Sequence, residues 1–209
     1  RPSCASCRSS APAPGACLLD IGCGIGAFVK RARALGYRAE GLEFDADAVA
    51  SAVAAGLPVR LGALPDTGLD AGTYDVLTLS QVIEHVHDPR AAIKECFRLL
   101  KSGGWFWLAT PNMAAPGHQR FGPDWRGLEP PRHLVLFSPG GLAGALADAG
   151  FADIHYLPPG QVSEWFYQAS ERVRNRTPRS QPVTLSAELR QAAQAVDRAT
   201  RRDPAAGEE

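Results

Sequence analysis

Short apolar runs alternate with helix-like stretches along this chain from Cys17 onward. Strands buried inside a parallel sheet read as continuous hydrophobic runs, and the helices that connect them cover both faces of the sheet. The pattern therefore predicts a doubly wound α/β domain with a mostly parallel sheet. The expected strands are Cys17–Ile21, Arg38–Glu43, Pro58–Leu61, Tyr74–Leu79, Gly104–Ala109 and Phe151–Leu157.

Start and stop signals define the helices. Gly36 and Gly56 follow two of them, and Asp88 before Pro89 is typical of a helix start. The last helix is amphipathic, with an apolar face opposite its charged residues. The expected helices are Ala27–Leu35, Ala46–Ala55, Pro89–Leu100, Ser138–Ala149, Gln161–Val173 and a final one that places Leu185, Leu189, Ala193 and Val196 on one face.

The sequence also predicts how the chain is divided. Residues 1–16 are expected to be a flexible segment, residues 17–160 a ligand-binding domain, and residues 161–209 a helical segment and tail. Within the domain, Pro111–Phe137 is rich in proline, glycine, histidine and aromatic residues, which favours an ordered lid. Asp203–Glu209 is expected to be disordered.

The charge balance excludes several classes of protein. The 209 residues include 22 Lys+Arg and 22 Asp+Glu, so the chain has no net positive charge that would attract nucleic acid. Apolar residues make up 45% of the chain, which suffices for a hydrophobic core. No apolar run approaches the roughly 20 residues of a membrane span, and no signal-peptide pattern opens the chain. We expect a cytoplasmic protein with a small-molecule substrate, no nucleic-acid partner and no membrane span; the oligomeric state stays open.

The five cysteines are too scattered for a disulfide framework. Cys4 and Cys7 form a C-x-x-C that is either half of a zinc site or a pair of free thiols, because structural zinc needs four ligands. Cys23 and Cys96 are expected to be small buried hydrophobes.

A glycine loop joins the first strand to the first helix. Gly22, Gly24 and Gly26 let a ligand approach the backbone and the amides at the helix start. Gly22, Gly24 and Ala27 also fit the dinucleotide fingerprint, so the glycines alone leave NAD open. Asp20 decides for a cationic ligand, because a carboxylate there repels pyrophosphate and attracts the ammonium and sulfonium of S-adenosyl-L-methionine (SAM). A carboxylate that only braces the loop is the alternative.

Glu43 ends the second expected strand, one β-α unit beyond the glycine loop. Its carboxylate can accept hydrogen bonds from both ribose hydroxyls of a nucleoside, and Phe44 can lie beside the adenine. The alternative for Glu43 is a solvated acid in a turn.

Four motifs in this order resemble the class I SAM-dependent methyltransferases, which have a Rossmann-like fold. They are Leu18–Gly26, the acidic end of the second strand, Ser80–Pro89 and Leu99–Gly104. The similarity covers about Cys17–Leu157. Within that superfamily the chain is similar to the ubiquinone-pathway O-methyltransferases, and to bacterial methyltransferases with a Trp-Arg-Gly-Leu and Pro-Arg-His segment, here Phe121–Leu134.

The resemblance implies cofactor contacts at the glycine loop, at the ends of the second and fourth strands, and after the third strand. The residues concerned are Asp20, Gly22, Cys23, Gly24, Gly26, Glu43, Phe44, Ala63, Leu64, Leu79, Ser80 and Gln81.

Two departures from the family pattern affect the expectations. In the ubiquinone-pathway enzymes the Glu-His after strand four is preceded by another Glu and is associated with a divalent metal. Here that position is Gln81, a poorer ligand for a hard cation, so we expect no metal. The family's seventh strand is not evident, although Gly207–Glu209 resembles the lead-in to it.

Methyl transfer from a sulfonium is an in-line displacement, so the enzyme mainly holds a nucleophile behind the methyl group and excludes water. An alcohol or phenol benefits from a base, and His133 and His85 are the catalytic candidates. The alternative for each is a structural hydrogen bond to the backbone.

An acceptor pocket is expected in the lid, where aromatic side chains and arginines gather and an arginine can meet an anionic group. The alternative is that the aromatic residues only pack the lid. The candidate acceptor contacts are His118, Phe121, Trp125, Arg126 and Arg132.

The sequence thus predicts a methyltransferase that uses SAM and methylates a small molecule, on oxygen rather than on nitrogen or carbon. Two alternatives stay open. One is an NAD-dependent oxidoreductase. The other is a non-catalytic SAM-binding regulatory domain, which Gln81 favours.

Overall fold

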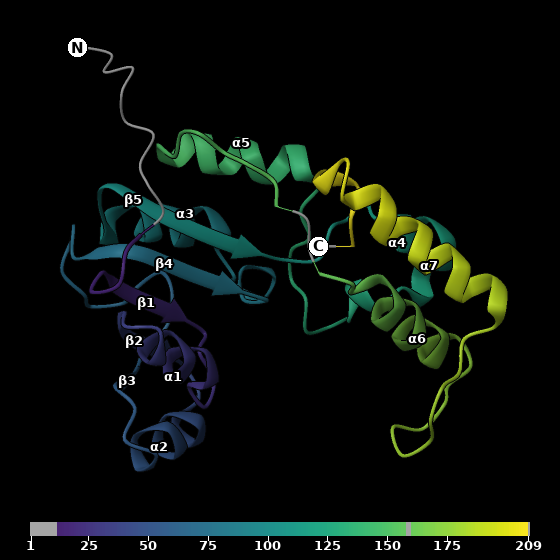
Figure 1. The fold of residues 1–209 in the computed structure, drawn as a ribbon, viewed down its shortest axis with the longest axis horizontal. Helices are drawn as coiled ribbons and strands as arrows, with labels where there is room; N and C mark the ends of the chain where they lie inside the picture. Colours follow the sequence, from purple (N-terminus) through teal and green to yellow (C-terminus); the bar gives the residue numbers. More distant parts are fainter. Residues whose placement is uncertain (1–11, 158–159, 209) are drawn as a thin grey trace. The chain divides into compact units, whose positions relative to one another are not determined.

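The computed structural model describes residues 12–157 and 160–208 (Figure 1). The described chain forms two compact units. The first unit holds the described residues up to Val82 and Arg90–Leu108, and the second holds Ile83–Pro89 and the residues from Ala109 onward. The chain therefore passes between the units around Val82, Pro89 and Leu108. Cys4 and Cys7 lie outside the described residues.

A five-stranded sheet forms the centre of the first unit, in the order β3-β2-β1-β4-β5. Strand β1 pairs in parallel with β2 on one side and with β4 on the other, and the arrows of β4 and β5 run the same way in Figure 1. This arrangement confirms the predicted doubly wound α/β class. The strands are β1 (Cys17–Ile21), β2 (Arg38–Glu43), β3 (Val59–Leu61), β4 (Tyr74–Ser80) and β5 (Leu100–Ala109).

The helices of this unit follow the predicted signals closely, and they are α1 (Ala27–Ala34), α2 (Ala46–Ala54) and α3 (Pro89–Leu99). In α3 the buried side chains of Ala92, Cys96 and Leu99 recur at the helical period. Leu18 of β1 belongs to a buried cluster with Val29 of α1, which couples the first strand to the first helix. Cys23 and Cys96 are free and buried, as predicted.

The strand predicted at Phe151–Leu157 is wrong, because none of these residues is in a strand. The amide of Phe151 donates to the Leu146 carbonyl at 3.1 Å, so the segment begins as the closing turn of a helix. Asp153 has a φ of 54°, which interrupts any extended run, and the Tyr156 hydroxyl donates to the Pro139 carbonyl at 2.7 Å. Within the described residues no strand follows β5.

The second unit is helical. Its α-helices are α4 (Pro116–Phe121), α5 (Pro139–Ala149), α6 (Ser163–Arg174) and α7 (Ala187–Thr200), and short 3-10 turns lie at η1 (Ile83–His85), η2 (Gly122–Asp124), η3 (Arg126–Leu128) and η4 (Pro204–Ala206). An aromatic cluster forms its core. Phe121 meets Tyr167 edge to face with ring centroids 5.1 Å apart, and Trp125 stacks on Phe166 at 6.1 Å. The segment predicted as a lid thus contains a helix and two turns, anchored by this core.

The expectation of a disordered end is wrong for the described residues up to Glu208. The side chain of Glu208 is fully buried, and its carboxylate accepts hydrogen bonds from the Gly117 amide at 2.9 Å and from Trp125 Nε1 at 3.1 Å. Its carbonyl accepts from the Asn112 amide at 3.0 Å. Burial raises the pKa of Glu208 to about 7, against the effect of the two donors.

Among the described residues, no helix combines the length and the apolar character that crossing a membrane requires. This finding agrees with the absence of a long apolar run in the sequence.

The Glu208 carboxyl predicts a pH-dependent stability. Its folded pKa of about 7 exceeds the ordinary value of 4.5, so between these values the native state keeps a proton that the unfolded chain has released. Its contribution to stability therefore falls as the pH rises through this window. Relative to the wild type, Glu208→Gln should gain on the order of 2 kcal/mol between pH 4.5 and pH 8.

Urea titrations of both proteins across this range measure the difference. A difference in unfolding free energy that does not change with pH would contradict the assignment.

Candidate active site

The strand order of the first unit defines where a ligand can bind. Successive strands are added on one side of β1 up to β3 and then on its other side from β4 onward, so β1 and β4 flank a topological switch point. Ligands of open α/β sheets bind at the carboxyl ends of such strands. Asp20 and Ser80 lie near those ends. The polar residues predicted for the cofactor are therefore at the edge of the sheet that the fold prescribes.

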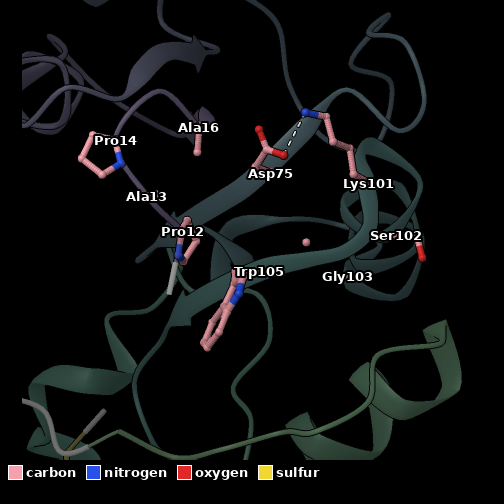
Figure 2. A pocket seen from close by; sticks show the side chains of 10 residues that line it. Pro12, Ala13, Pro14, Ala16, Asp75, Lys101, Ser102, Gly103 and Trp105 are labelled. Atoms are coloured by element: carbon pink, nitrogen blue, oxygen red, sulfur yellow. Dashed lines mark hydrogen bonds and ion pairs between the residues drawn. The ribbon is translucent and has the colours of Figure 1, made fainter. Parts of the chain in front are cut away.

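A cavity of about 320 Å³ lies at the opposite ends of the strands (Figure 2). Asp75 and Lys101 line it from the starts of β4 and β5 and are joined by a contact of 2.8 Å. Asp75 also accepts from the Cys17 amide, and the hydrogen bonds from Lys101 and Cys17 hold the pKa of its carboxyl below the usual range. This acid is already paired, and the cavity is not at the cofactor edge.

Asp20 is a buried acid that accepts a hydrogen bond from a neighbouring strand. It is 6% exposed, and Thr78 of the adjacent strand β4 donates to its Oδ1 at 2.7 Å. Burial raises the pKa of Asp20 to about 6, against the Thr78 hydrogen bond, and the negative charge of Glu43 adds to the rise. This hydrogen bond joins Asp20 to a side chain of the neighbouring strand.

The glycine loop has a backbone that other residues adopt only with strain. Gly22 has a φ of 74°, and a Cβ there would meet Val82 Cγ2 at 2.3 Å. Gly26, the residue before α1, has a φ of 80°, and its Cβ would meet Leu57 Cδ1 at 2.7 Å. The glycines thus permit both the turn and the close packing of the loop on the sheet.

Glu43 connects the loop to the end of β2. Its Oε2 accepts from the Gly24 amide at 2.7 Å, while its Oε1 accepts from the amides of Phe44 at 2.9 Å and Asp45 at 3.0 Å. Glu43 is 5% exposed, whereas the neighbouring Phe44 is 75% exposed. The sequence predicted a ribose contact for Glu43 and did not reveal that the same carboxylate also fixes the glycine loop.

The other predicted cofactor residues lie on the same strand ends. Leu79 is buried, Ser80 is exposed, and Gln81 has a φ of 55°, an unusual backbone for a residue other than glycine. Ala63 and Leu64 follow β3. Burial also raises the pKa of the Cys23 thiol to about 12, so this cysteine is not a nucleophile near neutral pH.

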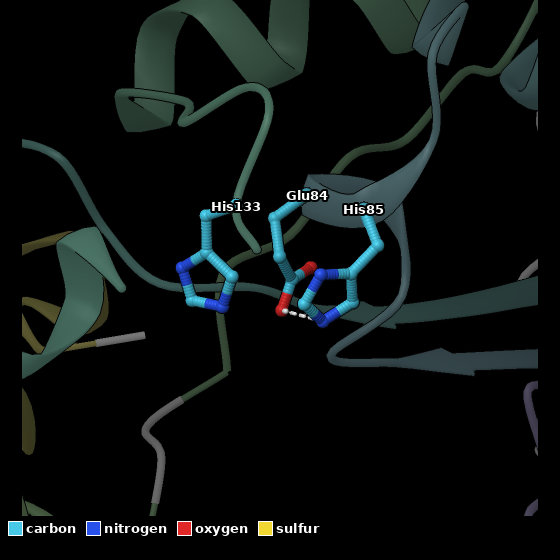
Figure 3. A group of neighbouring side chains, drawn as sticks. All are labelled: Glu84, His85 and His133. Carbon is cyan, nitrogen blue, oxygen red and sulfur yellow. Dashed lines mark ion pairs between the residues drawn. The ribbon is translucent and has the colours of Figure 1, made fainter. Parts of the chain in front are cut away.

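A separate cluster in the second unit brings Glu84, His85 and His133 together (Figure 3). Glu84 and His85 lie in the turn η1, and His133 comes from the loop after η3. The amide of Leu134 donates to the Glu84 carbonyl at 2.7 Å, which attaches this loop to the turn. The two imidazole centroids are 4.9 Å apart.

Both histidines are bonded to the backbone through the same ring atom. Nδ1 of His85 lies 2.9 Å from the Arg132 carbonyl, and Nδ1 of His133 lies 2.7 Å from the Gly127 carbonyl. Because a carbonyl only accepts, each Nδ1 must be the donor, which leaves Nε2 of the neutral ring with a free lone pair. The structural and chemical roles predicted for these histidines are therefore compatible.

The remaining predicted acceptor contacts have partners within the second unit. Phe121 and Trp125 are buried in the aromatic core, which matches the packing alternative. Arg126 and Arg132 both contact Glu129, at 2.6 and 3.3 Å. Burial favours the neutral acid, but the two arginines outweigh it and hold the pKa of Glu129 below its usual value.

His118 bonds the Met113 carbonyl at 2.9 Å and lies against the ring of Trp125. It stays a prediction that an acceptor contacts His118, Phe121, Trp125, Arg126 and Arg132.

Comparison with known proteins identifies the family of this chain. Residues 7–156 match the family described as "Methyltransferase domain". The chain belongs to this family. It is a class I methyltransferase with a Rossmann-like fold, and the cofactor of that class is SAM.

Relatives and solved structures agree with the assignment. Ubiquinone biosynthesis O-methyltransferases of Paraburkholderia xenovorans and Burkholderia ambifaria are each 34% identical to this chain, over 105 and 101 residues. These matches cover 47% and 45% of this chain but only 45% and 44% of those proteins.

A SAM-dependent methyltransferase structure from Mesorhizobium loti covers 82% of this chain and 89% of its own, with a TM-score of 0.58 and 23% identity. A structure from Thermotoga maritima, described as a possible histamine N-methyltransferase, also has a TM-score of 0.58 and 23% identity, over 67% of this chain and 66% of its own. At this identity the two structures show the shared fold.

The buried Asp20 predicts how this methyltransferase binds SAM as the pH changes. If the ionised carboxylate attracts the cationic donor, affinity must fall as the pH drops below the Asp20 pKa of about 6. Between pH 7 and pH 5 the Kd for SAM should rise about tenfold, because one unit below its pKa only about a tenth of an acid is ionised. Calorimetry over this range measures the change.

Asp20→Asn should bind weakly and without this pH response, while Asp47→Asn on the exposed start of α2 should behave as the wild type. An Asp20→Asn protein with the wild-type pH response would refute the role.

The carboxylate of Glu43 gives a second prediction for the cofactor site. Glu43→Gln replaces one accepting oxygen by an NH2 group that faces a backbone amide, and such a mismatch costs about 1–3 kcal/mol. We expect lower thermal stability and at least about tenfold weaker SAM binding, as measured by calorimetry. Glu40→Gln, at a position in the same strand but outside the site, is the matched control. Wild-type affinity in Glu43→Gln would show that the loop does not depend on this carboxylate.

Proposed function

We propose that this protein transfers the methyl group of SAM to an oxygen of a small-molecule acceptor. The observation that carries the proposal is a glycine loop that is flanked by two buried acids, Asp20 and Glu43, at the switch point of a methyltransferase sheet. Such a site suits a cationic nucleoside donor better than a pyrophosphate, which two carboxylates would repel. Oxygen as the accepting atom is supported by the relatives that are named O-methyltransferases.

Within this proposal the residues of the first unit hold the donor. Asp20 faces the charged methionine part of SAM, Glu43 accepts from the ribose, and Phe44 lies on the adenine. The exposed face of Phe44 supports this role, because an aromatic ring that is 75% exposed offers a stacking surface. The backbone of the loop and of Ala63 and Leu64 completes the nucleoside contacts.

His133 and His85 act on the acceptor. In its neutral form each ring has an Nε2 lone pair that can accept a hydrogen bond from a hydroxyl as its oxygen attacks the methyl group, and each ring is oriented through Nδ1. When bound, SAM would supply its methyl group to the attacking oxygen and keep the electron pair of the broken carbon–sulfur bond, and the hydroxyl proton would pass to Nε2 of one of the histidines.

Transfer of labelled methyl from SAM to a panel of phenols, catechols and hydroxylated quinone precursors tests the activity. Tight SAM binding without transfer to any acceptor would favour the non-catalytic alternative, and binding of NAD in preference to SAM would favour an oxidoreductase.

His133→Ala should leave SAM binding unchanged and slow the transfer step. Loss of a group that assists proton removal lowers a rate by about 10²–10⁴-fold. Single-turnover transfer measures the step, and His155→Gln, an exposed histidine outside the cluster, is the control. An unchanged rate in His133→Ala would remove this residue from the mechanism.

A further inference from the structure

Glu84 holds a carboxylate that the described protein groups leave incompletely satisfied. The residue is 0% exposed, and Thr110 Oγ1 donates to its Oε2 at 3.0 Å. Its Oε1 has no hydrogen-bond partner within the described part of the chain. Buried carboxylates are normally paired with a charge or bound to a metal, because an isolated one is expensive to bury. This oxygen therefore points to a cationic partner.

Two imidazole nitrogens share the space in front of this oxygen. Nε2 of His85 lies 4.0 Å from Glu84 Oε1, and ligand atoms of Glu84, His85 and His133 all lie within 4.8 Å of one another. Three ligands bound to one ion at about 2.0–2.2 Å would be about 3.5 Å apart in a tetrahedral arrangement. Side-chain rotations that close the cluster by about 1 Å would therefore complete it around an ion.

The surroundings already orient these groups as a metal site requires. Metal-binding histidines donate their other ring N–H to a carbonyl or carboxylate, which fixes the tautomer and the direction of the lone pair. His85 and His133 both do so, to the carbonyls of Arg132 and Gly127. Thr110 orients the carboxylate of Glu84 in a similar way, because its hydroxyl donates to Oε2 and leaves Oε1 without a hydrogen bond among the described residues.

We propose that Glu84, His85 and His133 bind a divalent transition-metal ion of the zinc type. Two imidazoles and one carboxylate are the ligands that Zn²⁺ and its neighbours prefer, whereas Mg²⁺ and Ca²⁺ prefer oxygen ligands alone. The three side chains leave at least one position of the ion for a water or an acceptor oxygen. His133 from a distant segment completes the set, so Gln81 is not needed as a ligand.

A protonated histidine is the competing partner for Glu84. His133 Nε2 also lies 3.6 Å from Glu129 Oε2, which in turn contacts Arg126 and Arg132. If the histidines were charged and paired with these acids, the cluster would repel a cation. Metal binding distinguishes the two arrangements directly.

Calorimetry of chelator-treated protein with Zn²⁺ is the test, with Co²⁺ as a spectroscopic probe. We expect one equivalent of Zn²⁺ to bind, a rise in melting temperature with Zn²⁺, and visible Co²⁺ absorption of a low-coordinate nitrogen-oxygen site. An excess of Mg²⁺ should not displace the ion. Glu84→Gln and His133→Ala should each abolish stoichiometric binding.

Thr110→Val tests the support of the carboxylate, and its Zn²⁺ affinity should fall about 10- to 100-fold. His155→Gln, which removes an exposed histidine, should bind as the wild type. Circular dichroism checks that each variant is folded. Failure of the wild type to bind Zn²⁺ would overturn the proposal in favour of the protonated histidine pair. Binding that survives in folded Glu84→Gln would overturn it by showing that the ion binds elsewhere.

The inference does not rest on the proposed function, because binding is measured without a methyl donor or acceptor. A bound ion would occupy the same Nε2 lone pairs that the metal-free protein offers to an acceptor. Zinc binding without methyl transfer, or transfer without zinc binding, would therefore separate failure of one proposal from failure of the other.

Discussion

The hydrogen bonds of Glu43 hold the candidate cofactor site together. Gly22, Gly24 and Gly26 of the glycine loop have no side chain, so the shape of the loop depends on what binds its backbone. One carboxylate accepts three amides, one from the loop at Gly24 and two from the turn that follows β2. Burial at 5% exposure strengthens these bonds, because water competes little for them. The loop and the turn therefore keep a common geometry before any ligand arrives.

The same acids define which ligand the site favours. Asp20 and Glu43 are both buried, and the charge of Glu43 contributes to the raised pKa of Asp20. Two neighbouring carboxylates in a site of low polarity attract a cation strongly and oppose a diphosphate. Two buried carboxylates thus favour SAM over a dinucleotide at this site, a choice that the glycine spacing leaves open.

Local patterns predicted the first unit well, because its strands and helices are short, regular and bounded by clear signals. β1 through β4 and the first three helices lie where apolar runs, Gly36, Gly56 and Pro89 indicated, whereas β5 begins at Leu100 and not at the predicted Gly104. The sixth predicted strand failed because its apolar composition does not reveal the left-handed backbone at Asp153. Burial of Glu208 could not be read from sequence either, since its partners Gly117 and Trp125 are far away along the chain.

The metal site proposed for the second unit would extend this limit from fold to chemistry. The neutral Gln81 was the reason to expect no metal, and that reason considers only ligands on one stretch of chain. A metal site needs ligands that are near in space, and the loop that carries His133 is attached to the turn of Glu84 by a backbone hydrogen bond of 2.7 Å. In the proposed site His133 takes the place of the acidic ligand that Gln81 replaces in the motif. The exchange of a carboxylate for an imidazole shifts the preference of the site from hard cations toward zinc-like ions.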